Sequence, residues 1–179
     1  MAERSTPNSG GVFDGGLVMD QQVNSTTDVH PRVLFACSAG GHLAQLLRLE
    51  PWYRDLDVRW VTFDLPDAIS LLRDRDVVWA YHPTTRSFKH LLRNAGLSWK
   101  QIRSYKPDVI VSSGAAIAVP FFWIGKMLGV KTVYVEVIDR IDTRTLTSRL
   151  VSPVTDLFVA QEPEQVELFP GSQYIGRLL

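Results

Sequence analysis

The stretch RVLFACSAGGHLAQLL, residues 32–47, sets the fold of the chain. Its first half is a short apolar run of strand-forming residues, and its second half places Leu43, Leu46 and Leu47 at helical spacing. A glycine pair separates the two halves, and Pro51 follows the helical pattern. The stretch therefore predicts a strand, a tight turn and a helix that stops at Pro51.

The same alternation continues along the chain. Apolar runs predict further strands at residues 57–63, 76–82, 107–113, 130–137 and 155–161, with a last short run at 173–176. Helical patterns lie at residues 65–74, with Asp64 as candidate cap and Pro66 near the start, and at residues 87–103 and 145–151. Strands that are nearly continuously apolar and alternate with helices indicate a Rossmann-like parallel α/β sheet covered on both faces.

Ligands of such sheets bind outside the carboxyl ends of the strands. Functional residues are therefore expected in the loops at residues 38–42, 82–86, 112–116 and 136–144.

The composition limits the class of protein. A chain of 179 residues that is 45% apolar suits one domain, expected at residues 31–179, after a polar tail at residues 1–30 that resembles no signal peptide. Nineteen basic and nineteen acidic side chains balance to zero, which does not favour nucleic acid. The lone Cys37 excludes an intrachain disulfide, favours a reducing compartment and is expected to be a buried, unreactive thiol.

The histidines and the longest apolar segment bear on metal binding and on membrane insertion. The four histidines, His30, His42, His82 and His90, show no metal-ligand spacing, so no metal site is expected. The apolar segment at residues 114–130 is short for a membrane span and is interrupted by a proline and a lysine.

The helical pattern at residues 87–103 is amphipathic. Its apolar stripe comprises Phe88, Leu91, Leu92, Ala95, Trp99 and Ile102, with a candidate break at Gly96. Its basic residues are Lys89, Arg93, Lys100 and Arg103. Two interpretations compete: a helix packed on the core, which explains the stripe more simply, and a helix in the headgroup region of an anionic membrane.

The glycine turn SAGGH, residues 38–42, has two interpretations of equal weight. Backbone N–H groups at a strand-to-helix turn suit an anion, but a simple tight turn would have the same sequence. His42 lies near the helix start, where the helix dipole favours neutral imidazole, so it either accepts a proton from a substrate hydroxyl or only caps and packs.

Several motifs in order carry a family resemblance: SAGGHL at 38–43, TTRS at 84–87, KPDVIVSSGAAIAVP at 106–120 and YVEVIDRIDTRTLTSRL at 134–150. From residue 32 onward the chain resembles the acceptor-binding subunit of two-part GT-B glycosyltransferases, such as the membrane-anchoring subunit of the dolichol-linked N-acetylglucosaminyltransferase and bacterial exopolysaccharide and capsule counterparts. It is also similar to the amino-terminal half of the enzyme that adds N-acetylglucosamine to the peptidoglycan lipid intermediate.

The resemblance implies the amino-terminal half of a GT-B fold and a separate partner chain that carries most of the site for a UDP-sugar donor. It implies transfer of the sugar, with inversion and with neither metal nor cofactor, to a polyprenyl-diphosphate-linked acceptor in polysaccharide synthesis. It also implies peripheral attachment to the cytoplasmic face of a membrane.

Site residues follow from the matched motifs. His42 is the candidate base, with a binding role as the alternative, and Glu136 is expected to bind a sugar hydroxyl or orient the base unless it only pairs with Arg140. The expected substrate-binding residues are Ser38, Gly40, Gly41, Arg86, Ser113, Gly114 and Arg140. Ala115 and Val137 depart from the family pattern beside two of these positions.

The sequence is also compatible with two other classes of protein to different degrees. A nicotinamide-dependent oxidoreductase is disfavoured because the turn lacks the G-x-G-x-x-G spacing. A scaffold that recruits and activates the donor-binding subunit, without taking part in proton transfer, remains an alternative.

Overall fold

The computed structural model describes residues 30–83, 88–139 and 142–178. Its strands are β1 Arg32–Ala36, β2 Asp57–Thr62, β3 Asp76–Trp79, β4 Val109–Ser112, β5 Lys131–Val135, β6 Leu157–Ala160 and β7 Gln173–Tyr174. Its helices are α1 Gly41–Leu47, α2 Glu50–Tyr53, α3 Pro66–Leu71, α4 Phe88–Tyr105, α5 Ala118–Met127, α6 Leu146–Val151 and α7 Pro163–Leu168, with a 3₁₀ turn at Ser152–Val154.

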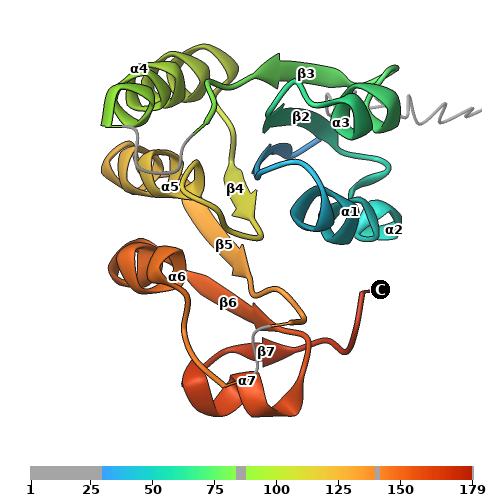
Figure 1. The fold of residues 1–179 in the computed structure, drawn as a ribbon, viewed down its shortest axis with the longest axis vertical. Helices are drawn as coiled ribbons and strands as arrows, with labels where there is room; N and C mark the ends of the chain where they lie inside the picture. Colours follow the sequence, from blue (N-terminus) through green and yellow to red (C-terminus); the bar gives the residue numbers. More distant parts are fainter. Residues whose placement is uncertain (1–29, 84–87, 140–141, 179) are drawn as a thin grey trace, which may run out of the picture.

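The strands form one sheet in the order β3-β2-β1-β4-β5-β6-β7, and every pairing is parallel. Helices α4, α5 and α6 lie along one face, and α1, α2 and α3 lie along the other (Figure 1). This arrangement confirms the Rossmann-like fold class.

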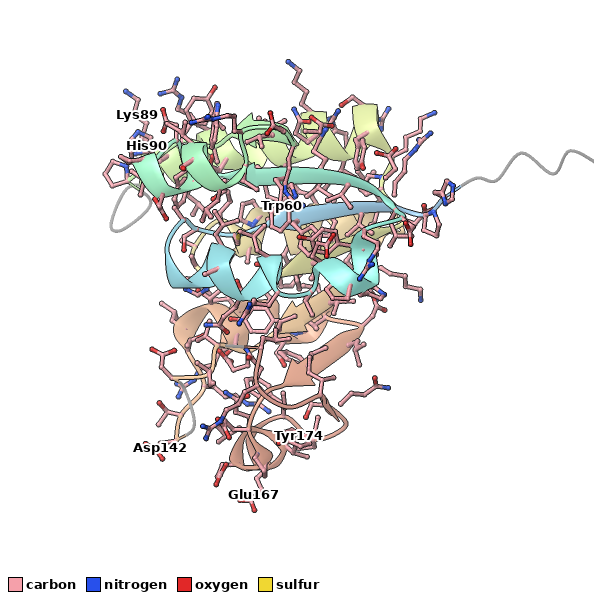
Figure 2. All side chains as sticks on the ribbon, turned by 90° about the vertical axis from the view of Figure 1, so that its right-hand side faces the viewer. Trp60, Lys89, His90, Asp142, Glu167 and Tyr174 are labelled. Carbon is pink, nitrogen blue, oxygen red and sulfur yellow. The ribbon has the colours of Figure 1, made fainter. Side chains whose placement is uncertain are left out.

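Each face of the sheet has its own apolar core. On the α1 side, the ring of Trp60 stacks on Phe35 with centroids 4.3 Å apart, and Trp60 lies inside the molecule (Figure 2). On the α5 side, Phe121 and Phe122 are fully buried against β4 and β5 residues such as Ile110. Burial on both faces explains why the strand sequences are nearly continuously apolar.

The apolar segment at residues 114–130 forms a loop and helix α5. Among the described residues, no helix combines the length and the apolar character that a membrane span requires.

Two helix boundaries differ from the sequence prediction. Helix α1 ends at Leu47, and Pro51 lies in the first turn of α2 instead of stopping α1, because proline fits the first turn of a helix, where no N–H is needed. Asp64 does not cap α3: its cap position is Leu65, and the Asp64 carboxylate lies 2.8 Å from Nε2 of His82.

Helix α4 differs from the sequence prediction both in its continuity and in the side chains that it buries. It continues through Gly96 without a break, and part of its apolar stripe faces outward, with Leu92 58% and Trp99 45% exposed. The side that faces the sheet carries buried polar residues, Asn94 and Ser98 among them. Asn94 is accommodated because its side-chain amide makes two hydrogen bonds with the main chain of Tyr81, so the interior polar group is satisfied. The interpretation of this stripe as core packing is therefore wrong for Leu92 and Trp99, and right for Ile102.

Candidate functional site

The predicted residues after β1 and β4 interlock. Nδ1 of His42 lies 2.9 Å from the carbonyl oxygen of Ser113, and the Ser113 hydroxyl donates back to the carbonyl oxygen of His42 over 3.0 Å. The two contacts join the glycine turn to the β4 loop, because β1 and β4 are neighbours in the sheet. The imidazole is therefore anchored to the β4 loop, and among the described residues no side chain caps α1.

The contact with Ser113 defines the tautomer of His42. A carbonyl oxygen only accepts hydrogen bonds, so the proton of the neutral ring is on Nδ1 and the basic lone pair is on Nε2. Burial lowers the pKa of His42 below its ordinary value, although the hydrogen bond to Ser113 and the negative charge of Asp139 act in the opposite direction. At neutral pH the ring is thus uncharged and able to accept a proton at Nε2.

Gly114 is the point of closest approach in this cluster. Its φ of +118° lies in the positive range that residues with a side chain rarely adopt, and a Cβ there would lie 2.8 Å from the Tyr134 hydroxyl and 3.2 Å from Cε1 of His42. Only glycine lets the three groups meet without displacement.

Glu136 follows β5 and is 1% exposed. Its Oε1 accepts the N–H of Val137 over 3.1 Å, and its own N–H donates to Val159 of β6. Tyr134 lies two residues earlier and so on the same face of β5. Burial raises the pKa of the Tyr134 hydroxyl, and the negative charge of Glu136 raises it further. Glu136 is therefore an interior carboxylate at the carboxyl end of the sheet, and not the surface charge that the simple ion-pair interpretation assumed.

One backbone N–H of the glycine turn already has a hydrogen-bond partner within the protein. The N–H of Gly40 donates to the Asp67 carboxylate of α3 over 2.7 Å, so this amide has an internal anion as its partner. No atom lies within 4 Å of a Cβ built on Gly40 or Gly41, so space for an approaching group surrounds the turn. Ser38 precedes the turn and is partly buried.

The structure brings His42, Ser113 and Gly114 into contact, and places Glu136 at the same edge of the sheet two residues after Tyr134. The predicted residues Arg86 and Arg140 lie outside the described residues. Within residues 30–83, 88–139 and 142–178, no group of three or more His, Cys, Asp or Glu side chains is arranged to hold a metal ion.

Sequence reasoning missed Tyr134, Asp67 and Asp139. Tyr134 could have been found, because alternation along β5 puts it beside Glu136. Asp67 and Asp139 act on the glycine turn and on His42 only through tertiary packing, and the sequence carries no local sign of either contact.

The parallel Rossmann-like sheet, with this polar cluster at the carboxyl ends of β1, β4 and β5, has the fold of the amino-terminal half of a GT-B protein. Among solved structures, MurG of Acinetobacter baumannii is similar, with a TM-score of 0.66 and 16% identity over 82% of this chain and 44% of that one. UDP-N-acetylglucosamine 2-epimerase of Rickettsia bellii is similar to the same degree, with a TM-score of 0.66 and 11% identity over 83% of this chain and 45% of that one. The chain thus spans less than half of each.

The sequence defines the family. The model described as "Oligosaccharide biosynthesis protein Alg14 like" matches residues 62–178, more than half of the chain, so the chain belongs to the Alg14-like family. A human relative, named UDP-N-acetylglucosamine transferase subunit ALG14, is 27% identical over 187 residues, which cover 85% of this chain and 87% of the human one. The family resemblance noted from the sequence motifs is confirmed.

Proposed function

We propose that this chain is the acceptor-binding subunit of a split, inverting glycosyltransferase that moves a sugar from a UDP-sugar to a hydroxyl of a polyprenyl-diphosphate-linked acceptor. The observation that carries the proposal is the orientation of His42, whose Nδ1 is fixed on the Ser113 carbonyl so that Nε2 is the basic nitrogen. Family membership supports it, because the human relative is named as a subunit of a UDP-N-acetylglucosamine transferase.

The residues have distinct tasks in this reaction. Nε2 of His42 takes the proton of the acceptor hydroxyl as its oxygen attacks C1 of the donor sugar. The bond from C1 to the diphosphate oxygen breaks, and the UDP leaves with the bonding electron pair. Glu136 accepts a hydrogen bond from a sugar hydroxyl once its surroundings shift on acceptor binding, since it is only 1% exposed in the free chain. Ser113 and Gly114 fix the position of the imidazole. Gly40, Gly41 and Ser38 leave room for the acceptor, and Arg86 and Arg140 contact phosphate groups.

The donor site lies mainly on a partner chain in this proposal. The chain corresponds to less than half of the MurG chain, and the carboxyl ends of its strands form an edge that a second Rossmann-like domain would face. Because the human relative is named as a subunit, we expect a partner chain to supply the nucleotide-binding half, and UDP-N-acetylglucosamine is the first donor to test because the human relative is named for it. Exopolysaccharide or capsule synthesis remains the proposed context.

A membrane-facing surface is proposed on α4, α5 and α6. These helices lie side by side on one face of the sheet (Figure 1), and the indole N–H of Trp123 in α5 donates to Leu150 in α6. Exposed apolar side chains lie on all three: Leu92, Trp99, Trp123, Met127, Leu146 and Leu150. Because the three helices are neighbours, these side chains are the candidates for one membrane contact surface.

Basic side chains accompany this surface. Lys89 extends from the start of α4 into solvent (Figure 2), and Arg103 lies over the ring of Trp99 at 5.3 Å. Apolar groups flanked by cations suit the headgroup region of an anionic bilayer. We therefore propose peripheral attachment through this surface, on the cytoplasmic face, where a lipid-linked acceptor is within reach.

The proposed attachment is tested by flotation of the full chain with anionic liposomes. The variant Leu92→Ser/Trp99→Ser should lose flotation, whereas Trp52→Ser/Ile69→Ser, with comparably exposed apolar residues on α2 and α3, should float like the wild type. Equal flotation of both variants would refute this surface as the membrane contact.

The catalytic proposal is tested with a co-purified donor-binding chain, UDP-N-acetylglucosamine and a polyprenyl-diphosphate-linked sugar. Transfer that requires both chains, and that falls by at least about 100-fold in His42→Gln while the complex still forms, is the expected result. Unchanged transfer in His42→Gln would support the scaffold alternative, in which this chain only recruits and activates its partner.

A further inference from the structure

Three buried glutamines lie directly behind the Glu136 loop. They come from different elements: Gln45 from α1, Gln161 from the end of β6 and Gln165 from α7. None of them is more than 4% exposed. Buried amides are costly unless their hydrogen-bonding groups are satisfied, so their partners show what the cluster holds together.

Gln161 is the centre of this glutamine cluster. Its Nε2 donates to Oε1 of Gln45 and, over 2.8 Å, to the carbonyl oxygen of Glu136. Its Oε1 accepts the N–H of Leu178 over 3.0 Å. Both the NH₂ group and the oxygen of the Gln161 amide thus have partners. The NH₂ group faces the Glu136 carbonyl, because a carbonyl oxygen can only accept a hydrogen bond and the amide oxygen cannot donate one.

Gln165 holds the next peptide. Its Nε2 donates to the carbonyl oxygen of Val137 over 2.8 Å, and its Oε1 accepts the N–H of Gln161 over 2.8 Å. The main chain of Glu136 and Val137 is therefore held at two successive carbonyls by side chains from the β6–α7 region.

The same cluster reaches the carboxyl-terminal segment, residues 174–178. This segment returns from β7 toward α1 (Figure 1), where Nε of Arg48 donates to the carbonyl oxygen of Leu178 over 3.1 Å. Leu178 is thus held by a surface arginine on one side and by Gln161 on the other. One amide connects this segment with Glu136.

We propose that Gln161 is a positioning residue that sets the main-chain position of Glu136 according to the position of the carboxyl-terminal segment. This inference rests on the proposed function for its effect on transfer, but its structural part stands without it. A shift of Leu178 changes the acceptor end of the Gln161 amide, and the donor end transmits the change to the Glu136 carbonyl. A small displacement of a substrate-binding group is costly, since about 1 Å is enough to cost about 100-fold in rate.

The first test is hydrogen exchange on the full chain alone. Gln161→Met, which keeps the length of the side chain and removes its amide, should accelerate exchange at residues 134–139 by at least about ten-fold. Arg48→Ala, at the surface, should accelerate the same peptide in the same direction but less. The matched control is Asn94→Leu, which removes another buried amide with two main-chain hydrogen bonds, and it should leave this peptide unchanged.

The second test is kinetic, on the complex with the donor-binding chain. Gln161→Met should lower kcat by about 10- to 100-fold with little change in KM for UDP-N-acetylglucosamine, because the donor is held mainly by the partner. Asn94→Leu should leave both constants unchanged at a temperature where it is folded.

The outcomes separate the two proposals. Absence of transfer by the wild-type complex would refute the proposed function, while the exchange experiment still decides the role of Gln161. Exchange at residues 134–139 that is unchanged in Gln161→Met, or equally fast in Asn94→Leu, would overturn the positioning role. An effect of Arg48→Ala confined to residues 172–178 would overturn the link to the carboxyl-terminal segment.

Discussion

Replacing Gly114 by alanine tests how tightly the candidate site is packed. The backbone at Gly114 has φ +118°, and such a conformation costs a residue with a Cβ about 1–3 kcal/mol. The new Cβ would also lie 2.8 Å from the Tyr134 hydroxyl and 3.2 Å from Cε1 of His42, and overpacking of this kind costs about 1–3 kcal/mol more. We therefore expect Gly114→Ala to lower the free energy of unfolding by about 4 kcal/mol.

The second substitution, Tyr134→Phe, separates the two contributions. It removes the hydroxyl oxygen and leaves the ring carbon Cζ at 3.6 Å, an ordinary contact, so it should relieve part of the overpacking but none of the backbone strain. The double variant Gly114→Ala/Tyr134→Phe should thus be more stable than the sum of the single effects predicts, by about 1–2 kcal/mol.

Gly129→Ala is the matched control, since Gly129 also has a positive φ, +79°, but no atom within 4 Å of a built Cβ. It should cost about 1 kcal/mol and show no coupling to Tyr134→Phe. Urea unfolding followed by tryptophan fluorescence measures the three single variants and the two double variants that combine each alanine with Tyr134→Phe. A loss below about 1 kcal/mol in Gly114→Ala, or a coupling below about 0.5 kcal/mol, would refute the packing argument.

Three further predictions concern titrating groups. Because burial lowers the pKa of His42, kcat of the complex should fall only as the pH drops below 6.5. Asp139→Asn removes a charge that raises this pKa, so it should move the acidic limb of the pH profile to still lower pH. A limb that does not move would contradict the role of His42 as the base. Burial raises the pKa of Cys37 to about 12, so a thiol reagent should label the chain at the rate of unfolding and not faster. Burial raises the pKa of Asp156, but the hydrogen bond from Lys126 and other contacts outweigh this and lower it below 3.8. The stability from Asp156 is therefore present above pH 3.8 and lost as the pH falls through the lowered pKa. Because solvent screens this ion pair, Asp156→Asn should cost about 1 kcal/mol at pH 7 and less in strong acid, as urea unfolding at both pH values would show.

The strands could be predicted from the sequence because a parallel sheet buried on both faces leaves continuous apolar runs. The boundary between α1 and α2 could not, because Pro51 both prevents a helix from continuing and suits the first turn of a new one. Helix α4 shows a different limit: periodicity detects an apolar stripe, but it does not tell which side of the helix faces the sheet. The buried side combines the apolar Ile102 and Tyr105 with Asn94, whose amide is satisfied by the Tyr81 main chain, and the sequence does not display that contact.

The candidate site was predictable where it follows from topology. The carboxyl ends of neighbouring parallel strands meet at one edge, so His42 and Ser113 converge as expected. The residues behind the site were not predictable, because the contacts of Gln161 with Gln45 and Leu178 join segments that are far apart in the chain. Such contacts depend on the register of packed elements and leave no local pattern.

The exposed part of the apolar stripe on α4 also has a practical consequence for anyone who purifies this protein. Leu92 and Trp99 contribute little to the core, which α4 contacts through Leu97, Ile102 and Tyr105. In water without lipid, the exposed apolar surface favours association between copies of the chain. Exchanging Leu92 and Trp99 for polar residues should therefore give a preparation that stays monodisperse at high concentration while the melting temperature is nearly unchanged, a rare case in which solubility is improved without loss of core packing.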